Sequence, residues 1–308
     1  MPSESGSGLR IDDTARPLSP LISILNRISF LAGKVYEVKN MAKPTVAHKH
    51  HVLVKPGGQI PATAPRLARD GGPYTQRGTT PNFNIFFENA LGANGPVLAD
   101  AVLANCEQDL AALQNVFGNI AIPNLPFNVY VVTGDFGAYH ATCAATELHC
   151  AAFDGSNRDL VRMLMVAEAD EVCMAAQGVG WNCGFSNGEA LSRILATEAY
   201  PAQLDGFASA SAWLNSNRDD FVNQNDPTDT NYISIGCAAL FINYLRNQTG
   251  LQFALGQIVQ NGGQTLTQTY QNVTGNNDDP FPAFADLLNT KFPAGTAANW
   301  PDDNPFPI

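Results

Sequence analysis

This 308-residue sequence lacks most of the features that reveal a function directly. No apolar run reaches the roughly 18 residues that a membrane-spanning helix needs. The most apolar stretch near the start, residues 18–32, is interrupted by Pro20, Asn26 and Arg27, so we interpret it as a short amphipathic helix rather than a signal peptide. The sequence contains no P-loop or dinucleotide-binding fingerprint. Membrane spans and nucleotide-binding enzymes are therefore without support.

Basic residues are scarce in most of the chain. Residues 81–308 contain 6 Lys/Arg against 23 Asp/Glu, a net charge of −17, whereas residues 1–80 contain 11 against 5, a net charge of +6. Because phosphate binding needs clustered Lys and Arg, the acidic body argues against nucleic acid as the main partner. The basic arm is either a solvated tail or a segment that contacts an acidic surface, the body's own included.

None of the six cysteines has the CxxC spacing of a structural zinc site. Two pairs, Cys143 with Cys150 and Cys173 with Cys183, are close enough in sequence to form disulfides. An equally good interpretation is that the cysteines are buried, reduced thiols that pack as small hydrophobic side chains. The cysteine count alone therefore does not fix the compartment.

The composition divides the chain into an arm, residues 1–80, and a globular domain, residues 81–308. The arm is rich in Pro, Gly and Ser, and Lys55–Pro81 is predicted to be a linker. Lys34–Val38 and His51–Lys55 are predicted as short strands, and the HKHH cluster of His48, His50 and His51 as a solvated loop. The body is expected to begin near Asn82.

Within the body, apolar spacing predicts a small sheet region followed by a mostly helical region, an α+β order. The expected strands are Pro126–Val132 and Thr146–Phe153. The expected helices are Pro96–Phe117, Arg158–Ala176, Gly188–Ala199, Ala208–Asn215, Ile233–Gln248, Leu251–Gln260, Leu266–Val273 and Phe281–Thr290.

Three glutamates in two consecutive helices are the strongest functional signal. Glu168 and Glu171 lie three residues apart in Arg158–Ala176 and so share one helix face. This helix is apolar nearly all round, which predicts burial, and a buried carboxylate is destabilising unless it is paired, protonated or bound to a metal. Glu189 lies in the first turn of the next helix, where the helix dipole alone also favours a carboxylate.

The order of these elements resembles the zincin fold, and more narrowly the gluzincin metallopeptidases. It consists of a strand, a buried acidic helix, a short Gly-rich turn and a second helix with an early Glu. The resemblance covers about Pro126–Phe292. In that family HExxH on the first helix supplies two His ligands and the general-base Glu, and a Glu on the following helix is the third zinc ligand.

Matched to HExxH, the segment Ala167-Glu168-Ala169-Asp170-Glu171 keeps only the general base, Glu168. Ala167 replaces the first His and Glu171 the second, while Glu189 matches the third ligand. The resemblance therefore implies a carboxylate-rich site, for which zinc is not expected and Ca²⁺, Mg²⁺ or Mn²⁺ is better suited. His140 or His149, on or near the neighbouring strand, is a candidate for supplying an imidazole.

Three interpretations of function remain open. The chain is a zincin-like binding or structural module without normal zinc peptidase chemistry, with a protein or peptide partner. Alternatively, it is a hydrolase that uses Glu168 as general base, with Glu171 and Glu189 holding a non-zinc metal or acting as a metal-free pair as in glycoside hydrolysis. Finally, the carboxylates are salt-bridged structural residues, for example Glu189 with Arg193. The sequence leaves the substrate and oligomeric state open, and slightly favours a cytoplasmic location.

Overall fold

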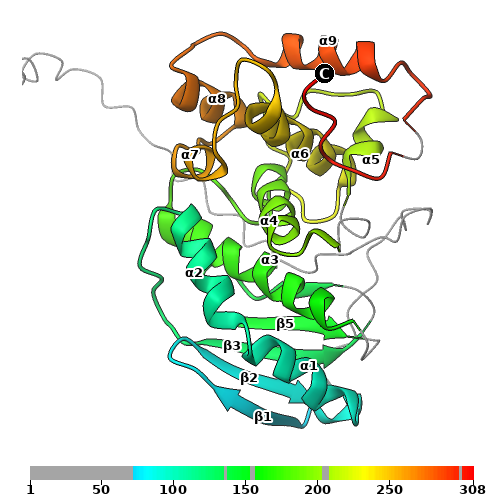
Figure 1. The fold of residues 1–308 in the computed structure, drawn as a ribbon. Coiled ribbons are helices and arrows are strands. Elements are labelled where there is room, and N and C mark those ends of the chain that lie inside the picture. The colour runs from blue at the N-terminus through cyan, green and yellow to red at the C-terminus, as the bar shows by residue number, and fades with distance from the viewer. Residues whose placement is uncertain (1–71, 135–136, 153–156, 203–207, 298–299) are drawn as a thin grey trace, which may run out of the picture. The chain divides into compact units, whose positions relative to one another are not determined.

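The first part of the described chain is a five-stranded mixed sheet (Figure 1). The computed structural model describes residues 72–134, 137–152, 157–202, 208–297 and 300–308, all within one unit that covers residues 46–308. Across the sheet the strands follow the order β1-β2-β3-β5-β4. Their bounds are Tyr74–Thr79 for β1, Phe83–Glu88 for β2, Phe127–Thr133 for β3, Ala138–His140 for β4 and Glu147–Ala152 for β5.

The short strand β4 forms one edge of the sheet and runs antiparallel to its neighbour β5. Strands β2, β3 and β5 run parallel, whereas β1 and β4 run antiparallel to their neighbours. Ala138 pairs with Cys150 and His140 with Leu148. Because successive residues of a strand point to opposite faces, these four side chains lie on one face, and Tyr139 and His149 lie on the other.

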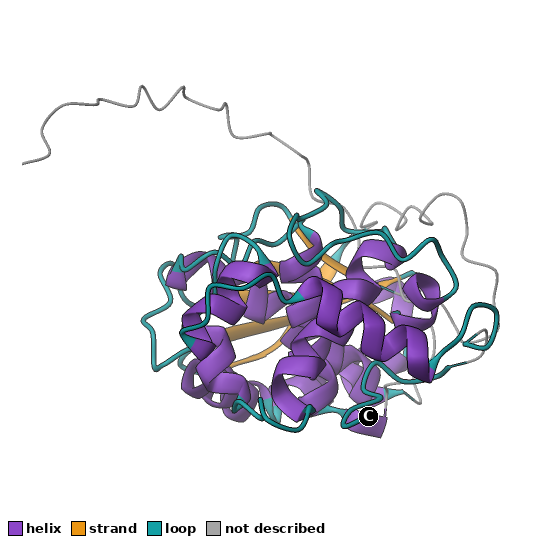
Figure 2. Cartoon of the chain, turned by 90° about the horizontal axis from the view of Figure 1, so that it is seen from above, coloured by secondary structure: helices purple, strands orange, loops and turns teal. Residues whose placement is uncertain are grey.

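Helices cover one face of this sheet, as the view from above shows (Figure 2). The first three are α1 (Asn94–Leu103), α2 (Cys106–Val116) and α3 (Arg158–Gln177). Helices α1 and α3 contact the strands directly, and α2 packs against α3. The buried alternate residues of β2 and β3 face this layer; they are Phe83, Ile85, Phe87, Phe127, Val129 and Val131.

The rest of the described chain is helical. Helix α4 (Ser186–Ala199) packs against both α3 and α6 (Tyr232–Asn247), and most residues of these three helices are buried. A short 3-10 helix, Asn89–Leu91, follows β2. The remaining helices are α5 (Ala210–Leu214), α7 (Leu255–Gln260), α8 (Leu266–Thr274) and α9 (Phe281–Lys291). The predicted α+β order is confirmed.

The structure corrects several predicted boundaries. The expected helix Pro96–Phe117 is two helices, because the backbone leaves the helical region at Asn105, whose φ is −130° and whose Nδ2 donates to the Ala101 carbonyl. Strand β1 lies inside Lys55–Pro81, so this range is not all linker. Helix α7 begins at Leu255 rather than Leu251, because Gln252 has a positive φ of 54° that a helix does not accept.

Other predictions lie outside the described residues. These are the amphipathic helix at 18–32, the strands at Lys34–Val38 and His51–Lys55, and the cluster of His48, His50 and His51. Among the helices of the described residues, none combines the length and the apolar character needed to cross a membrane.

The C-terminal segment packs into the helical region through Asp303. This buried carboxylate accepts the backbone N–H groups of Ser209, at 2.8 Å, and Ala210, at 2.6 Å, where α5 begins. Burial raises the pKa of Asp303 to about 6, although these two hydrogen bonds and the charge of Arg193 act in the opposite direction. Asp303 is thus a buried acid whose carboxylate is stabilised by backbone donors.

Candidate functional site

Helix α3 places two glutamates inside the protein. Asn157 caps its N-terminus by accepting the N–H of Leu160 at 3.1 Å, and Gly178, with a φ of 69°, ends it. All residues from Met163 to Met174 are buried. Glu168 is 0% exposed and Glu171 3%. The prediction that this helix is buried with both carboxylates is therefore confirmed.

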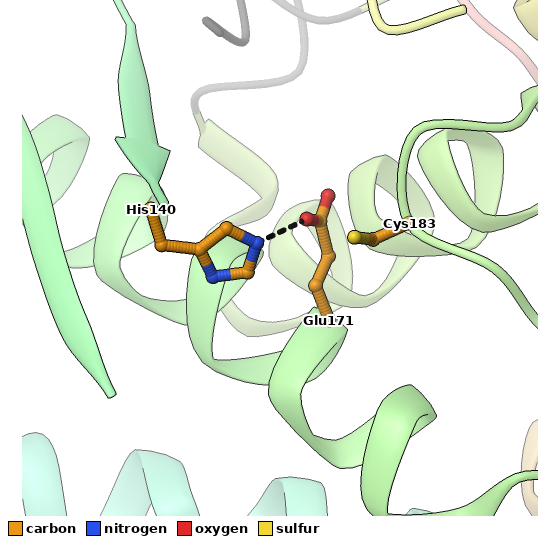
Figure 3. Close-up of side chains that lie close together, drawn as sticks. All are labelled: His140, Glu171 and Cys183. Atoms are coloured by element: carbon orange, nitrogen blue, oxygen red, sulfur yellow. Dashed lines mark ion pairs between the residues drawn. The ribbon is translucent and has the colours of Figure 1, made fainter. Parts of the chain in front are cut away.

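His140 meets these two glutamates from the edge strand β4. Its Nε2 lies 3.0 Å from Glu171 Oε2 (Figure 3), and its Nδ1 lies 3.9 Å from Glu168 Oε2. The imidazole is itself 2% exposed. The structure thus brings together three of the predicted site residues, which we name the His–Glu cluster: His140, Glu168 and Glu171. An imidazole in this position, when it carries a proton, offsets the mutual repulsion of the two buried carboxylates.

His149, the other imidazole candidate, lies on the opposite face of the sheet. Its ring stacks between Tyr130, with centroids 4.9 Å apart, and Tyr139, at 4.6 Å. Its Nε2 lies 3.1 Å from Glu147 Oε1. The next residue of β5, Cys150, faces the helices instead, and the Glu168 carboxylate contributes, after burial, to raising the pKa of its thiol well above the ordinary value. The structure therefore separates His149 from the His–Glu cluster.

A disulfide lies beside the cluster. Cys183, in the loop between α3 and α4, is bonded to Cys143, which follows β4 by three residues. The Sγ of Cys183, a ring nitrogen of His140 and a carboxylate oxygen of Glu171 all lie within 4.8 Å of one another (Figure 3). The bond therefore ties the end of β4, with His140, to the loop that follows the glutamate-bearing helix.

Both disulfide pairings suggested by the sequence are wrong. Cys150 and Cys173 are buried free thiols, as are Cys106 and Cys237. Burial raises the pKa of the Cys173 thiol, and the neighbouring Asp170 carboxylate raises it further. A raised pKa keeps such a thiol protonated, and it is therefore unreactive, because only the thiolate acts as nucleophile and metal ligand. Cys150 lies close enough to Glu168 to feel its charge, and the Cys143–Cys183 pair places a sulfur beside His140 and Glu171.

The position of Cys183 depends on a close backbone contact with α4. A Cβ atom on Gly188, in the first turn of α4, would lie 2.0 Å from the carbonyl oxygen of Asn182. Only glycine allows this approach. Gly180 is similarly restricted, with a φ of 127° and the backbone of Gly263 in the place of its missing Cβ. The loop, and with it Cys183, is held against the start of α4.

Glu189, the third predicted metal ligand, supports this same loop. It is 1% exposed, and its Oε1 accepts the backbone N–H of Gly184, the residue after Cys183, at 3.2 Å. One turn further along α4, Ser192 Oγ donates to the carbonyl of Ala167 at 2.9 Å. Glu189 is thus linked to the cluster through the loop, on a helix that contacts α3 at Ala167.

Arg193, the suggested salt-bridge partner of Glu189, extends from α4 toward the start of α6. Its guanidinium lies over the ring of Tyr232, 5.1 Å from the centroid, and its charge acts on Asp303.

Comparisons of the chain with protein-family models, curated proteins and solved structures found no match.

The described donor set does not make a zinc site with two His ligands and one Glu ligand. Ala167 has no ligand atom, and one imidazole, from β4, takes the place of two on the helix. In the disulfide state the sulfur of Cys183 is not a thiolate and so is not a good metal ligand. What remains is a buried cluster of one imidazole and two carboxylates, which is suited to sharing protons and to joining β4 to α3.

Proposed function

We propose that this chain is a zincin-like protein without zinc peptidase chemistry that serves as a binding or structural module. The observation that supports this proposal is the position of His140. Its imidazole faces Glu171 at 3.0 Å and Glu168 at 3.9 Å, inside a cluster that is almost completely buried. A general base has to reach the water or substrate proton that it removes, and here the candidate base Glu168 is buried and lies 3.9 Å from an imidazole of its own chain.

The acidic body determines the kind of partner that this function implies. Residues 81–308 have a net charge of −17, which attracts basic surfaces and repels acidic ones. A protein or peptide partner with an excess of Lys and Arg is the best match. The His–Glu cluster then has a structural role in holding β4 to α3.

A peptidase assay tests this function. The full chain, its Glu168→Gln variant and a zinc-supplemented sample are incubated with a mixed peptide library, and the products are identified by mass spectrometry. We expect no cleavage that depends on Glu168 and no stoichiometric zinc in the disulfide-bonded protein. Cleavage by the parent that disappears in Glu168→Gln would overturn the proposal.

The alternative, a hydrolase with Glu168 as general base, is favoured by the gathering of carboxylates in an apolar setting, since such groups are often functional. The same pair of proteins, assayed on glycosides and esters with Ca²⁺, Mg²⁺ or Mn²⁺ added, tests it. Turnover by the parent but not by Glu168→Gln supports the alternative, and its absence supports the binding or structural module.

A further inference from the structure

The Cys143–Cys183 disulfide separates two states of the site that differ in the ligands they offer. With the disulfide formed, His140 and Glu171 are the metal-binding groups of the three-atom cluster, and the Cys183 sulfur is covalently occupied. With the disulfide reduced, the same sulfur becomes a thiol that a metal can bind as thiolate. We propose that reduction of this bond creates a metal site made of His140, Glu171 and Cys183, which takes a thiolate-binding divalent ion such as Zn²⁺.

The distances suit three ligands of one ion. The three ligand atoms lie within 4.8 Å of one another. Tetrahedral ligands about 2.0–2.3 Å from a zinc ion lie roughly 3.3–3.8 Å apart, so a side-chain shift of about 1 Å brings even the widest pair to one ion. The ligand types also match, since nitrogen, oxygen and sulfur donors are those that zinc prefers, and thiolate shifts the preference away from Ca²⁺ and Mg²⁺. This inference deepens the proposed function and rests on it, because it names a ligand for two members of the His–Glu cluster, His140 and Glu171.

The exposure of the two sulfurs determines which one is released. Cys143 is partly exposed, whereas Cys183 is 3% exposed. A dithiol reductant attacks the more accessible sulfur, forms a mixed disulfide with Cys143 and expels the Cys183 thiolate. The second thiolate of the reductant then attacks the mixed disulfide, leaves as the cyclic disulfide and frees Cys143, which takes a proton. The metal binds the Cys183 thiolate in place of a proton.

Two single variants form a matched test, because each lacks the disulfide and keeps one of its two sulfurs. Cys143→Ser frees Cys183 permanently, and Cys183→Ser frees Cys143. Both retain the four buried thiols and every histidine of the chain. Co²⁺ is the probe, because thiolate ligation gives it a charge-transfer band, and Zn²⁺ is then used to displace it. The measurements use the full chain without air and without reductant.

We expect Cys143→Ser to bind one Co²⁺ with a thiolate band and to release it to Zn²⁺. Cys183→Ser should bind more than ~100-fold more weakly, since even the loss of a group that only supports a ligand costs about 10–100-fold in affinity. Adding Glu171→Gln to Cys143→Ser should weaken binding at least tenfold. Equal binding by the two single variants, or no thiolate band in either, overturns the proposal.

Wild-type protein provides the second measurement if Cys143→Ser does not fold. After reduction by a dithiol and removal of the reductant, it should bind one Co²⁺ with the thiolate band, and the untreated protein should not. Identical behaviour of the two samples would also overturn the proposal. Neither readout depends on peptidase activity, so cleavage in the peptidase assay would overturn the proposed function and leave the metal result interpretable.

Discussion

The two imidazoles of the described chain, nine residues apart, lie on opposite faces of one sheet and have different surroundings. His140 faces the helices and meets the carboxylates of Glu168 and Glu171. His149 faces the other way and lies between the rings of Tyr130 and Tyr139. Both are buried, yet His140 lies among buried carboxylates, whereas His149 lies between aromatic rings with its Nε2 near the exposed carboxylate of Glu147. The same residue type therefore has two roles, and the face of the sheet on which each histidine lies decides which role it has.

The inner imidazole should contribute far more to stability than the outer one. His140→Ala leaves two buried carboxylates without the group that faces them, and removing one member of a buried ion pair costs about 3–5 kcal/mol. His149→Ala removes two ring contacts worth about 1–2 kcal/mol together. Denaturant unfolding of both variants measures the difference. If His149→Ala is as destabilising as His140→Ala, the contrast between the two faces is wrong.

Breaking the disulfide should have an effect of comparable or slightly smaller size on the inner side. The bond closes a loop with a sequence separation of 40 residues, for which the chain-entropy relation gives about 4 kcal/mol. We expect the Cys143→Ser/Cys183→Ser double variant to lose about this much free energy of unfolding, measured with a metal chelator present. Reduced wild-type protein is the control and should show the same loss. A loss below about 1 kcal/mol would show that the inner face is held by its side chains alone.

Asp303 sharpens the comparison, because backbone N–H groups rather than an imidazole accompany this buried acid. Its pKa is about 6 in the folded protein, against an ordinary value near 3.9. The folded state therefore binds more protons between these values, and stability from this group falls as pH rises from about 4 to about 6, by roughly 3 kcal/mol, then stays constant. Asp303→Asn keeps the acceptor oxygen and cannot titrate.

The measurement is the difference in free energy of unfolding between wild type and Asp303→Asn from pH 4 to 7. It should move in favour of the variant across this range and level off above about pH 6. A difference that stays constant with pH would show that the backbone donors and Arg193 fully compensate the buried charge.

The sequence predicted the helical half of the molecule well because its elements have strong local signals. Helix α3 is apolar nearly all round and ends at Gly178, and both features are local. Glu168 and Glu171 share a face by helix geometry alone. Strand β1 has no such signal, because it lies in a Gly- and Pro-rich stretch and pairs with β2 through non-local hydrogen bonds.

The candidate site was harder to predict because its members come from separate elements. The choice between His140 and His149 depends on which face of β5 and β4 each occupies. The apolar residues Leu148 and Cys150 on either side of His149 were a readable sign that it points the other way. The Cys143–Cys183 bond had no sign in the spacing, because a disulfide depends on the distance between folded elements rather than on nearness in sequence.

The disulfide also has a mechanical consequence. It turns residues 143–183 into a covalent ring that contains all of β5 and α3. When the two ends of the oxidised protein are pulled apart, force bypasses this ring, and the sequence separation of 40 between the two cysteines adds no contour length. Reduction releases about 140 Å of extensible chain at roughly 3.5 Å per residue. In a single-molecule stretching record, the redox state of one bond would therefore appear as a change in length.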